Sequence, residues 1–172
     1  MTDIDMLAPT PASVALEDKE ILPEDIYEAE VVSAKRYLKD PHPTAKVQEP
    51  SLAVRLTIVP TDEKWKDHLP LWYGMKESTH DMSTMHKFFV DTTGEPVPVD
   101  SKGNIDIDYH EEEIDDGETI VRSQNFVGMK FKVVVKHNES GGKTYANVDS
   151  FVCTPKQKEQ NKEVYKETEI TA

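Results

Sequence analysis

The sequence predicts a mainly β domain, a small five-stranded barrel with one helix between its third and fourth strands and flexible segments at both ends. Several short runs alternate apolar and polar residues, which is typical of half-buried strands. Only one region has apolar residues at helical spacing, and both ends of the chain are polar without a period. The 172 residues suit one domain with tails. We expect an acidic arm at 1–20, a domain at 21–153 with an acidic insertion around 95–126, and a polar tail at 154–172.

The first two strands are predicted from their alternation. Residues 22–38 place Tyr27, Ala29 and Val31 on one face, and Glu28, Glu30 and Val32 on the other. Residues 39–51 hold three prolines and are expected to form a loop. The following strand has two distinct faces, one with Leu52, Val54, Leu56 and Ile58 and the other with Ala53, Arg55 and Thr57.

A third strand and a helix are predicted next. In residues 68–74 the alternation places Leu69, Leu71 and Tyr73 inward and Trp72 outward, and Pro70 favours an edge or bulged strand. Ser78 or Thr79 is the predicted helix cap, and Gly94 the predicted stop. The apolar positions of this helix recur three and four residues apart: Met82, Met85, Phe88 and Phe89.

The last part of the chain is predicted to contain a hairpin. Residues 95–126 lack a period and are treated as an insertion or long loop, whereas 127–152 form two strands around a turn at 138–142. Residues after Cys153 are expected to be a mobile tail or a short helix. Three strands, a helix and two more strands is the element order of an OB-fold. An open α+β sheet with one covering helix fits the same order.

The charge of the chain is segmental. The net charge is -13, yet residues 1–30 and 104–118 carry -8 each, so the remainder is +3. A mildly basic body makes an anionic partner possible. A single cysteine excludes a disulfide framework and a multi-cysteine zinc site, and it fits a reducing cytosol. We expect no membrane association, because no apolar run is long enough to cross a bilayer and the N-terminus lacks signal-peptide features.

The hairpin supplies the main candidates for binding. If Phe131, Val133 and Val135 face the core, the lysines between and beside them face outward. On the return strand Ala146, Val148 and Val152 are expected inward, and Lys143, Tyr145, Asn147 and Asp149 outward. Single-stranded DNA requires cations along its phosphates and flat rings for its bases. The predicted nucleic-acid-binding residues are Arg55, Trp72, Lys130, Lys132, Lys136, Lys143 and Tyr145.

Each of these residues also has an ordinary structural interpretation. Lysines are common on the solvated face of an antiparallel sheet, where they discourage edge pairing. Trp72 is either an exposed stacking platform or packed beneath the following helix. The acidic segment 104–118 is either solvated or a DNA mimic that covers the basic surface when no nucleic acid is bound.

Catalysis, cofactors and metal ions are not predicted. The histidines are scattered, and Cys153 is expected to be a packed thiol at a strand end. Asn104, Asp106 and Asp108 have the first spacings of an EF-hand loop, but Tyr109 occupies the position of the required glycine. At most a weak, adventitious divalent site remains there. We therefore expect a protein that is not an enzyme.

Four segments resemble the small OB-fold single-stranded-DNA-binding proteins of bacteriophages. They are LPEDIYEAEVVSA, SLAVRLTIVP, MHKFF and VGMKFKVVVKHNESGGKTYANVDSF. The resemblance covers about half the chain. It implies a protein that protects or organises single strands during phage DNA replication or recombination, in the host cytoplasm. Its implied partners are single-stranded DNA and replication or recombination proteins. The alternative is a non-enzymatic virion or host-interaction protein built on the same small barrel.

Overall fold

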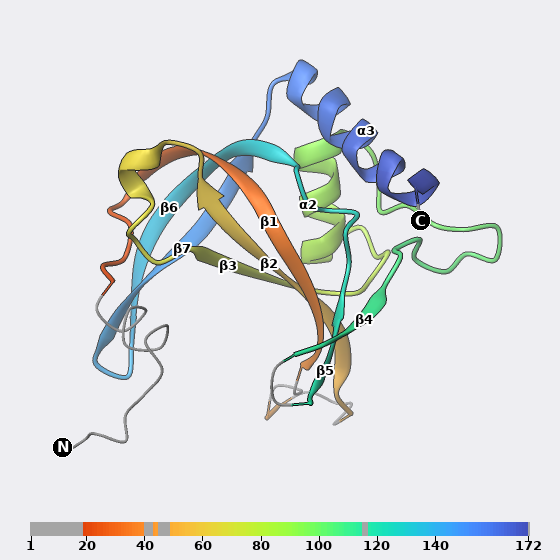
Figure 1. Cartoon of the computed structure of the whole chain (residues 1–172), viewed down its shortest axis with the longest axis horizontal. Coiled ribbons are helices and arrows are strands. Elements are labelled where there is room, and N and C mark those ends of the chain that lie inside the picture. The colour runs from red at the N-terminus through yellow and green to blue at the C-terminus, as the bar shows by residue number, and fades with distance from the viewer. Residues whose placement is uncertain (1–18, 40–42, 45–48, 115–116, 172) are drawn as a thin grey trace.

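A computed structural model describes residues 19–39, 43–44, 49–114 and 117–171. Its strands and helices follow one another as shown in Figure 1. In chain order they are β1 Asp25–Lys39, β2 Ser51–Pro60, the short 3-10 helix η1 Glu63–Trp65, β3 Leu71–Lys76, α2 Thr84–Thr93, β4 His110–Glu113, β5 Thr119–Arg122, β6 Lys130–Ser140, β7 Lys143–Val152 and α3 Pro155–Thr171. No helix in the described part of the chain is long and apolar enough to cross a membrane.

Strand β1 is the centre of a single antiparallel sheet. It pairs with β2 along most of its length, with β6 over Asp25–Glu30, and with β5 at Lys35 and Arg36. A register shift between Val31 and Ser33 leaves Val32 without an opposite residue in β2. Such a bulge bends a strand and increases its twist. One bent strand therefore joins three neighbours, and the sheet curls around the core.

The two ends of the curled sheet approach each other at β3 and β7. Hydrogen-bonded pairing runs in the order β3, β2, β1, β6, β7, and no ladder among the described residues joins β3 to β7. The two strands are nevertheless neighbours. The rings of Tyr73 in β3 and Phe151 in β7 make an edge contact with centroids 4.8 Å apart. We call this hydrogen-bond-free junction the β3–β7 seam.

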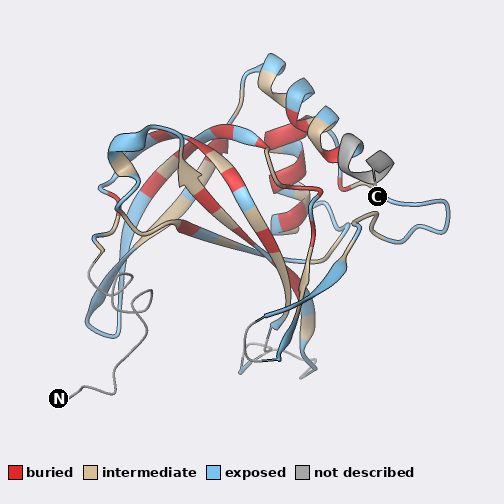
Figure 2. Ribbon diagram, in the orientation of Figure 1, coloured by how far each residue is buried: buried red, intermediate tan, exposed pale blue. Residues whose placement is uncertain are grey.

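The core lies between the curled sheet and α2. Buried residues alternate with more exposed ones along the strands and recur along α2 (Figure 2). Phe88 of α2 is completely buried and contacts the rings of Tyr73, Phe89, Phe126, Phe131 and Phe151. Aromatic contacts of this kind stabilise a core beyond the area they bury. This ring cluster fixes α2 against the inner face of the sheet.

The helix α2 confirms part of its sequence prediction. Met85, Phe88 and Phe89 are buried, and Gly94 ends the helix in a left-handed conformation with φ 77°. The predicted cap at Ser78 or Thr79 is wrong, because Ser83 is the N-cap and its hydroxyl oxygen accepts a hydrogen bond from the His86 N–H. Met82 precedes this cap and is therefore 86% exposed rather than buried.

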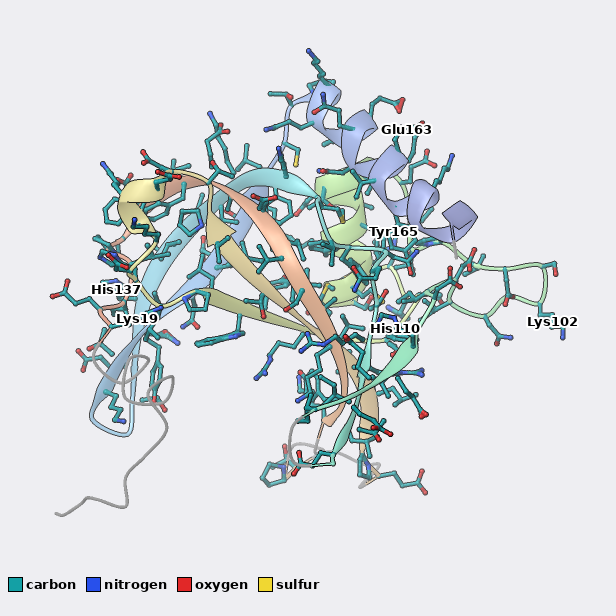
Figure 3. The ribbon with its side chains drawn as sticks, viewed as in Figure 1. Lys19, Lys102, His110, His137, Glu163 and Tyr165 are labelled. Carbon is teal, nitrogen blue, oxygen red and sulfur yellow. The ribbon has the colours of Figure 1, made fainter. Side chains whose placement is uncertain are left out.

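Residues after Cys153, expected to be a mobile tail or a short helix, form the 17-residue helix α3. Thr154 and Gln157 form a reciprocal capping box at its start, with distances of 3.0 and 3.1 Å. Tyr165 contacts the rings of Phe89 and Phe126, and Figure 3 shows it on the core side of α3, opposite Glu163. The sequence of this helix is mostly polar, because only a few side chains on one of its faces pack against the rest of the domain.

Buried Asn161 anchors α3 to the rest of the domain. Its amide Nδ2 donates to the carbonyl oxygens of Thr92 and Lys130, both at 2.9 Å. Its Oδ1 accepts from the Lys130 N–H at 2.8 Å. A buried amide in this arrangement satisfies backbone groups of both α2 and β6. One side chain thus connects the three elements.

The prediction of a mainly β chain with an antiparallel sheet is confirmed, but that of five strands is wrong. The sheet has seven, because the segment expected to be an insertion contributes β4 and β5. The acidic strand β4 lacks an apolar alternation and is held through its backbone pairing with β5. The turn of the last hairpin is also shorter than expected. Gly141 and Gly142 connect the strands directly with φ 59° and 80°, as a two-residue turn requires.

Three predicted side-chain orientations are corrected. A register shift opposite Val134 and Val135 leaves Asp149 without an opposite residue, so Phe151 rather than Val152 faces the core. Leu52 is exposed because it lies at the far end of the β1–β2 pair, opposite exposed Leu38. Ala53 is fully buried on the outer face. The predicted arm at 1–20 lies outside the described residues except for Lys19 and Glu20.

Candidate nucleic-acid interface

The outer surface of β1, β2 and β3 carries a continuous set of basic and aromatic side chains. Residues directly opposite each other in adjacent strands share a face. The pairing therefore places Lys35 beside Arg55 and Arg55 beside Gly74, with Tyr37, Ala53 and Lys76 in the next row. We call this surface the basic face. Its residues are Ser33, Lys35, Tyr37 and Lys39 of β1, Ser51, Ala53, Arg55 and Thr57 of β2, and Trp72, Gly74 and Lys76 of β3.

No residue of the basic face is acidic, although the chain holds 33 Asp and Glu residues. Within the described part of the chain, no salt bridge involves Lys35, Lys39, Arg55 or Lys76, whereas Arg36 and Arg122 are each paired with a glutamate. Lys35 and Arg55 are directly opposite each other. Like charges in this position destabilise a sheet. An anion bound between them would remove that cost.

Tyr37 lies across the middle of the basic face. A Cβ atom at position 74 would be 2.7 Å from the Tyr37 hydroxyl oxygen, so the close approach requires the glycine. Ala53 is directly opposite Tyr37 and completely buried. The small residues at positions 53 and 74 thus make room for a ring that lies along the sheet surface. A ring in this position presents a flat apolar surface next to the cations.

The predicted aromatic residues Trp72 and Tyr145 meet at the β3–β7 seam. They are 45% and 46% exposed, and both line a surface pocket with Ile21, Leu69, Pro70, Ala146 and Asn147. Trp72 therefore points outward, as the strand alternation predicts, and is not packed beneath α2. Tyr73 points inward instead and contacts Phe88. Two exposed rings beside each other are suited to contact with planar groups.

Two of the predicted lysines lie away from this site. Lys130 and Lys132 of β6 are exposed, as the alternation predicts, and are opposite Glu30 and Glu28 of β1. The Lys132 Nζ is 4.0 Å from the Glu28 Oε1. They lie on the side of β1 opposite to β2. Their charges therefore balance the acidic half of β1, and the structure does not bring them together with Arg55 and Trp72.

The other two predicted lysines belong to the β6–β7 hairpin. Lys136 is opposite Asn147 and diagonal to Tyr145, and Lys143 is next to the turn, opposite Ser140. Close by, the pKa of the Glu24 carboxyl is below its usual value, chiefly because the His137 N–H donates a hydrogen bond to it at 2.7 Å. The Lys136 charge adds to this effect. Lys136 thus adjoins both the aromatic pair and an acidic side chain.

Sequence reasoning missed four residues of the basic face: Lys35, Tyr37, Lys39 and Lys76. The first three alternate along β1, which is a signal in the sequence. The bulge at Val32 shifts the alternation by one residue, so the residues after it that face outward are not those expected from the alternation before it. Lys76 falls beyond the predicted end of the third strand, because β3 begins after Pro70 and continues to Lys76.

Other polar groups of the described residues are a packed thiol and a closed side-chain network. Burial raises the pKa of the Cys153 thiol to about 11, so the thiol is protonated at neutral pH. The described residues contain no group of three or more His, Cys, Asp or Glu side chains arranged to hold a metal ion. Arg36, Glu77 and Tyr109 form a closed network, with Arg36 bonded to both carboxylate oxygens of Glu77 and Tyr109 donating to one of them. The buried Tyr109 hydroxyl has a raised pKa and stays protonated.

Comparisons with protein families, with curated proteins and with solved structures found no match for this chain. The basic face is therefore the main evidence for function. It combines cations that form no salt bridge within the described part of the chain, a ring lying on the sheet and an adjoining pair of exposed aromatic residues. These are the two kinds of group that contact the phosphates and bases of a single nucleic-acid strand.

Proposed function

We propose that the chain is a non-enzymatic single-stranded-DNA-binding protein, which protects or organises DNA during phage replication or recombination. Phosphates bind to Lys35, Arg55 and Lys76, and bases stack on Trp72 and Tyr145. The phage context rests on the resemblance of four sequence segments to that family. The observation that carries the binding proposal is the direct opposition of Lys35 and Arg55, neither of which forms a salt bridge with a carboxylate among the described residues.

The fold proposed for this function is an OB-fold barrel with an added hairpin. The strand order β3, β2, β1, β6, β7 and the contact of Tyr73 with Phe151 across the seam support a partly open ring. The position of α2 between the third and fourth strands of that ring also agrees with an OB-fold. On this interpretation β4 and β5 are an insertion before the fourth strand, which extends the sheet next to β1.

The electrostatics of the free protein favour release of counterions on binding. Lys35 and Arg55 are opposite each other, so the free face attracts anions from solution. A phosphate that bridges them displaces these ions, and the affinity then falls as salt rises. Stacking on an exposed ring contributes about 1–3 kcal/mol per base and depends little on sequence. We therefore expect salt-dependent binding with weak sequence preference.

Tryptophan fluorescence tests the proposal directly. Trp65 is half-buried and Trp72 is exposed, so a Trp65→Phe variant leaves a single reporter on the basic face. Titration of this variant with oligo-dT should quench Trp72, and the midpoint should move to higher DNA concentration as salt rises. A Trp72→Phe variant that retains Trp65 should show much weaker quenching. No response of either variant at low salt would refute DNA binding.

A virion or host-interaction protein on the same barrel remains the second candidate. One observation favours it: Ile26 and Val152, on the strands around β6, are 59% and 49% exposed. Exposed apolar side chains on one wall are suited to a protein partner. If the protein does not bind oligo-dT at low salt but binds a partner protein through Ile26 and Val152, that result would support this second function. Ile26→Ser would then abolish binding of the partner protein, while substitutions of Lys35 and Arg55 would not.

A further inference from the structure

The hairpin formed by β4 and β5 continues the rows of the basic face and adds carboxylates to them. Lys35 is opposite Arg122 of β5, and Arg122 is opposite His110 of β4. These residues therefore share one side of the sheet. His110 lies on β4, as Figure 3 shows. The basic face thus borders directly on a hairpin that contains most of the acidic segment.

The acidic residues of this hairpin divide between its two sides. Glu112 is on the same side as Lys35, because it is two residues from His110 along β4. Glu118 is on that side by the same alternation from Ile120. Glu111 and Glu113 are opposite Val121 and Thr119 and lie on the other side. We call Glu112 and Glu118 the face-side carboxylates.

The face-side carboxylates end the run of positive charge. The Arg122 Nε is 2.7 Å from the Glu112 Oε2, and the His110 Nε2 is 3.5 Å from the same oxygen. Arg122 is therefore already neutralised where the row of cations reaches β5. Beyond it, Glu118 has no salt-bridge partner among the described residues. A phosphate therefore meets cations from β3 to β1, a neutralised Arg122–Glu112 pair on the hairpin, and the carboxylate of Glu118 beyond it.

The spacing of the strands decides what this boundary excludes. Neighbouring strands are about 4.8 Å apart, so β4 lies about 10 Å from β1 across the sheet. The two backbones of a B-DNA duplex are separated by grooves about 6 and 12 Å wide. A duplex with one backbone on Lys35 and Arg55 therefore places its other backbone within reach of the face-side carboxylates. The β6–β7 hairpin, at the opposite side of β3, limits displacement in the other direction (Figure 1).

We propose that Glu112 and Glu118 make the basic face selective for single-stranded over double-stranded DNA. This inference rests on the proposed function, since it concerns the same face. A single strand satisfies the cations of β1, β2 and β3 without reaching β4. A second strand has to approach a hairpin whose cation Arg122 is neutralised by Glu112 and whose other face-side carboxylate, Glu118, repels phosphate.

The test compares two variants of equal charge on opposite sides of one hairpin. Glu112→Gln with Glu118→Gln removes the face-side carboxylates, and Glu111→Gln with Glu113→Gln is the matched control. Affinities for oligo-dT and for a blunt duplex of the same length are measured by fluorescence anisotropy at low salt. The first variant also frees the Arg122 cation from Glu112, which favours a second strand at the hairpin, so the readout is the ratio of duplex to single-strand affinity.

The face-side variant should raise this ratio about tenfold, whereas the control should leave it within about twofold. Equal changes in the two variants would overturn the inference, because they would show an effect of net charge alone. An unchanged ratio in both would overturn it as well. Glu118→Gln alone, which breaks no salt bridge, should move the ratio in the same direction if the double variant is unstable. Wild-type protein that does not bind oligo-dT would refute the proposed function itself.

Discussion

The strongest test of the basic face is to remove Lys35 and Arg55 together and compare the result with the loss of two other lysines. Lys35→Gln with Arg55→Gln removes two charges from opposite positions on β1 and β2. Lys130→Gln with Lys132→Gln changes the net charge by the same amount on β6. The two double variants differ only in whether the lost cations face glutamates or each other.

The magnitude follows from counterion release. Each phosphate contact on a single strand contributes about 0.7 to the slope of log affinity against log salt. Two lost contacts should therefore lower the slope by about 1.4, which corresponds to a loss of affinity of about 25-fold at roughly 0.1 M salt. The control should lose less than about threefold, because Lys132 is already paired with Glu28 and only the general field changes.

The stability of the same variants provides an independent check. Removing both members of a like-charged pair relieves their repulsion, so the Lys35 and Arg55 variant should be as stable as the wild type, or more stable by about 0.3 kcal/mol. Fluorescence anisotropy gives the slopes, and urea denaturation gives the free energy of unfolding. Equal losses of slope in both double variants would refute the assignment of the basic face.

Three further predictions concern the scaffold. Asn161→Ala should lower the free energy of unfolding in urea by about 2–3 kcal/mol, because it leaves the Lys130 N–H and the Thr92 carbonyl without their buried partner; a loss below about 0.5 kcal/mol would contradict the anchoring role of α3. Gly74→Ala should lower the melting temperature, and Tyr37→Phe should restore most of the loss by removing the hydroxyl oxygen that is 2.7 Å from the new Cβ. The pKa of Cys153 is raised to about 11, which means that the folded state disfavours the thiolate. The contribution of this thiol to the free energy of unfolding should therefore be constant below the unfolded thiol pKa near 8.5 and decrease as the pH rises toward about 11. An equal decrease in the free energy of unfolding of a Cys153→Ala variant over this range would contradict the prediction.

Alternation alone predicted much of the sheet. It placed Phe131, Val133 and Val135 inside, and Arg55 and Trp72 outside, because a strand exposes every second residue regardless of its partners. It could not predict which strands are neighbours. The position of Lys35 beside Arg55 depends on the register between β1 and β2, and that register depends on a bulge at Val32 which has no clear sequence signal.

The lysines of β6 also show that alternation does not identify the neighbouring strand. Their outward orientation was predicted correctly, but their role depends on the strand next to them. β1 presents Glu28 and Glu30 to them, and these acids come from a segment about a hundred residues earlier in the chain. The attachment of α3 was missed although Thr154, Pro155 and Gln157 are a recognisable helix start. Its polar composition outweighed that signal.

The β3–β7 seam has a mechanical consequence for the domain. Everywhere else the described sheet is continuous through backbone hydrogen bonds, but here the two edges are held by side chains such as Tyr73 and Phe151. Separating these edges breaks no ladder, so the seam is the place where β3 and β7 move apart at the lowest free-energy cost. A ligand that contacts both Trp72 and Tyr145 acts as a clamp across that opening. Part of its binding free energy then appears as rigidity of the curled sheet.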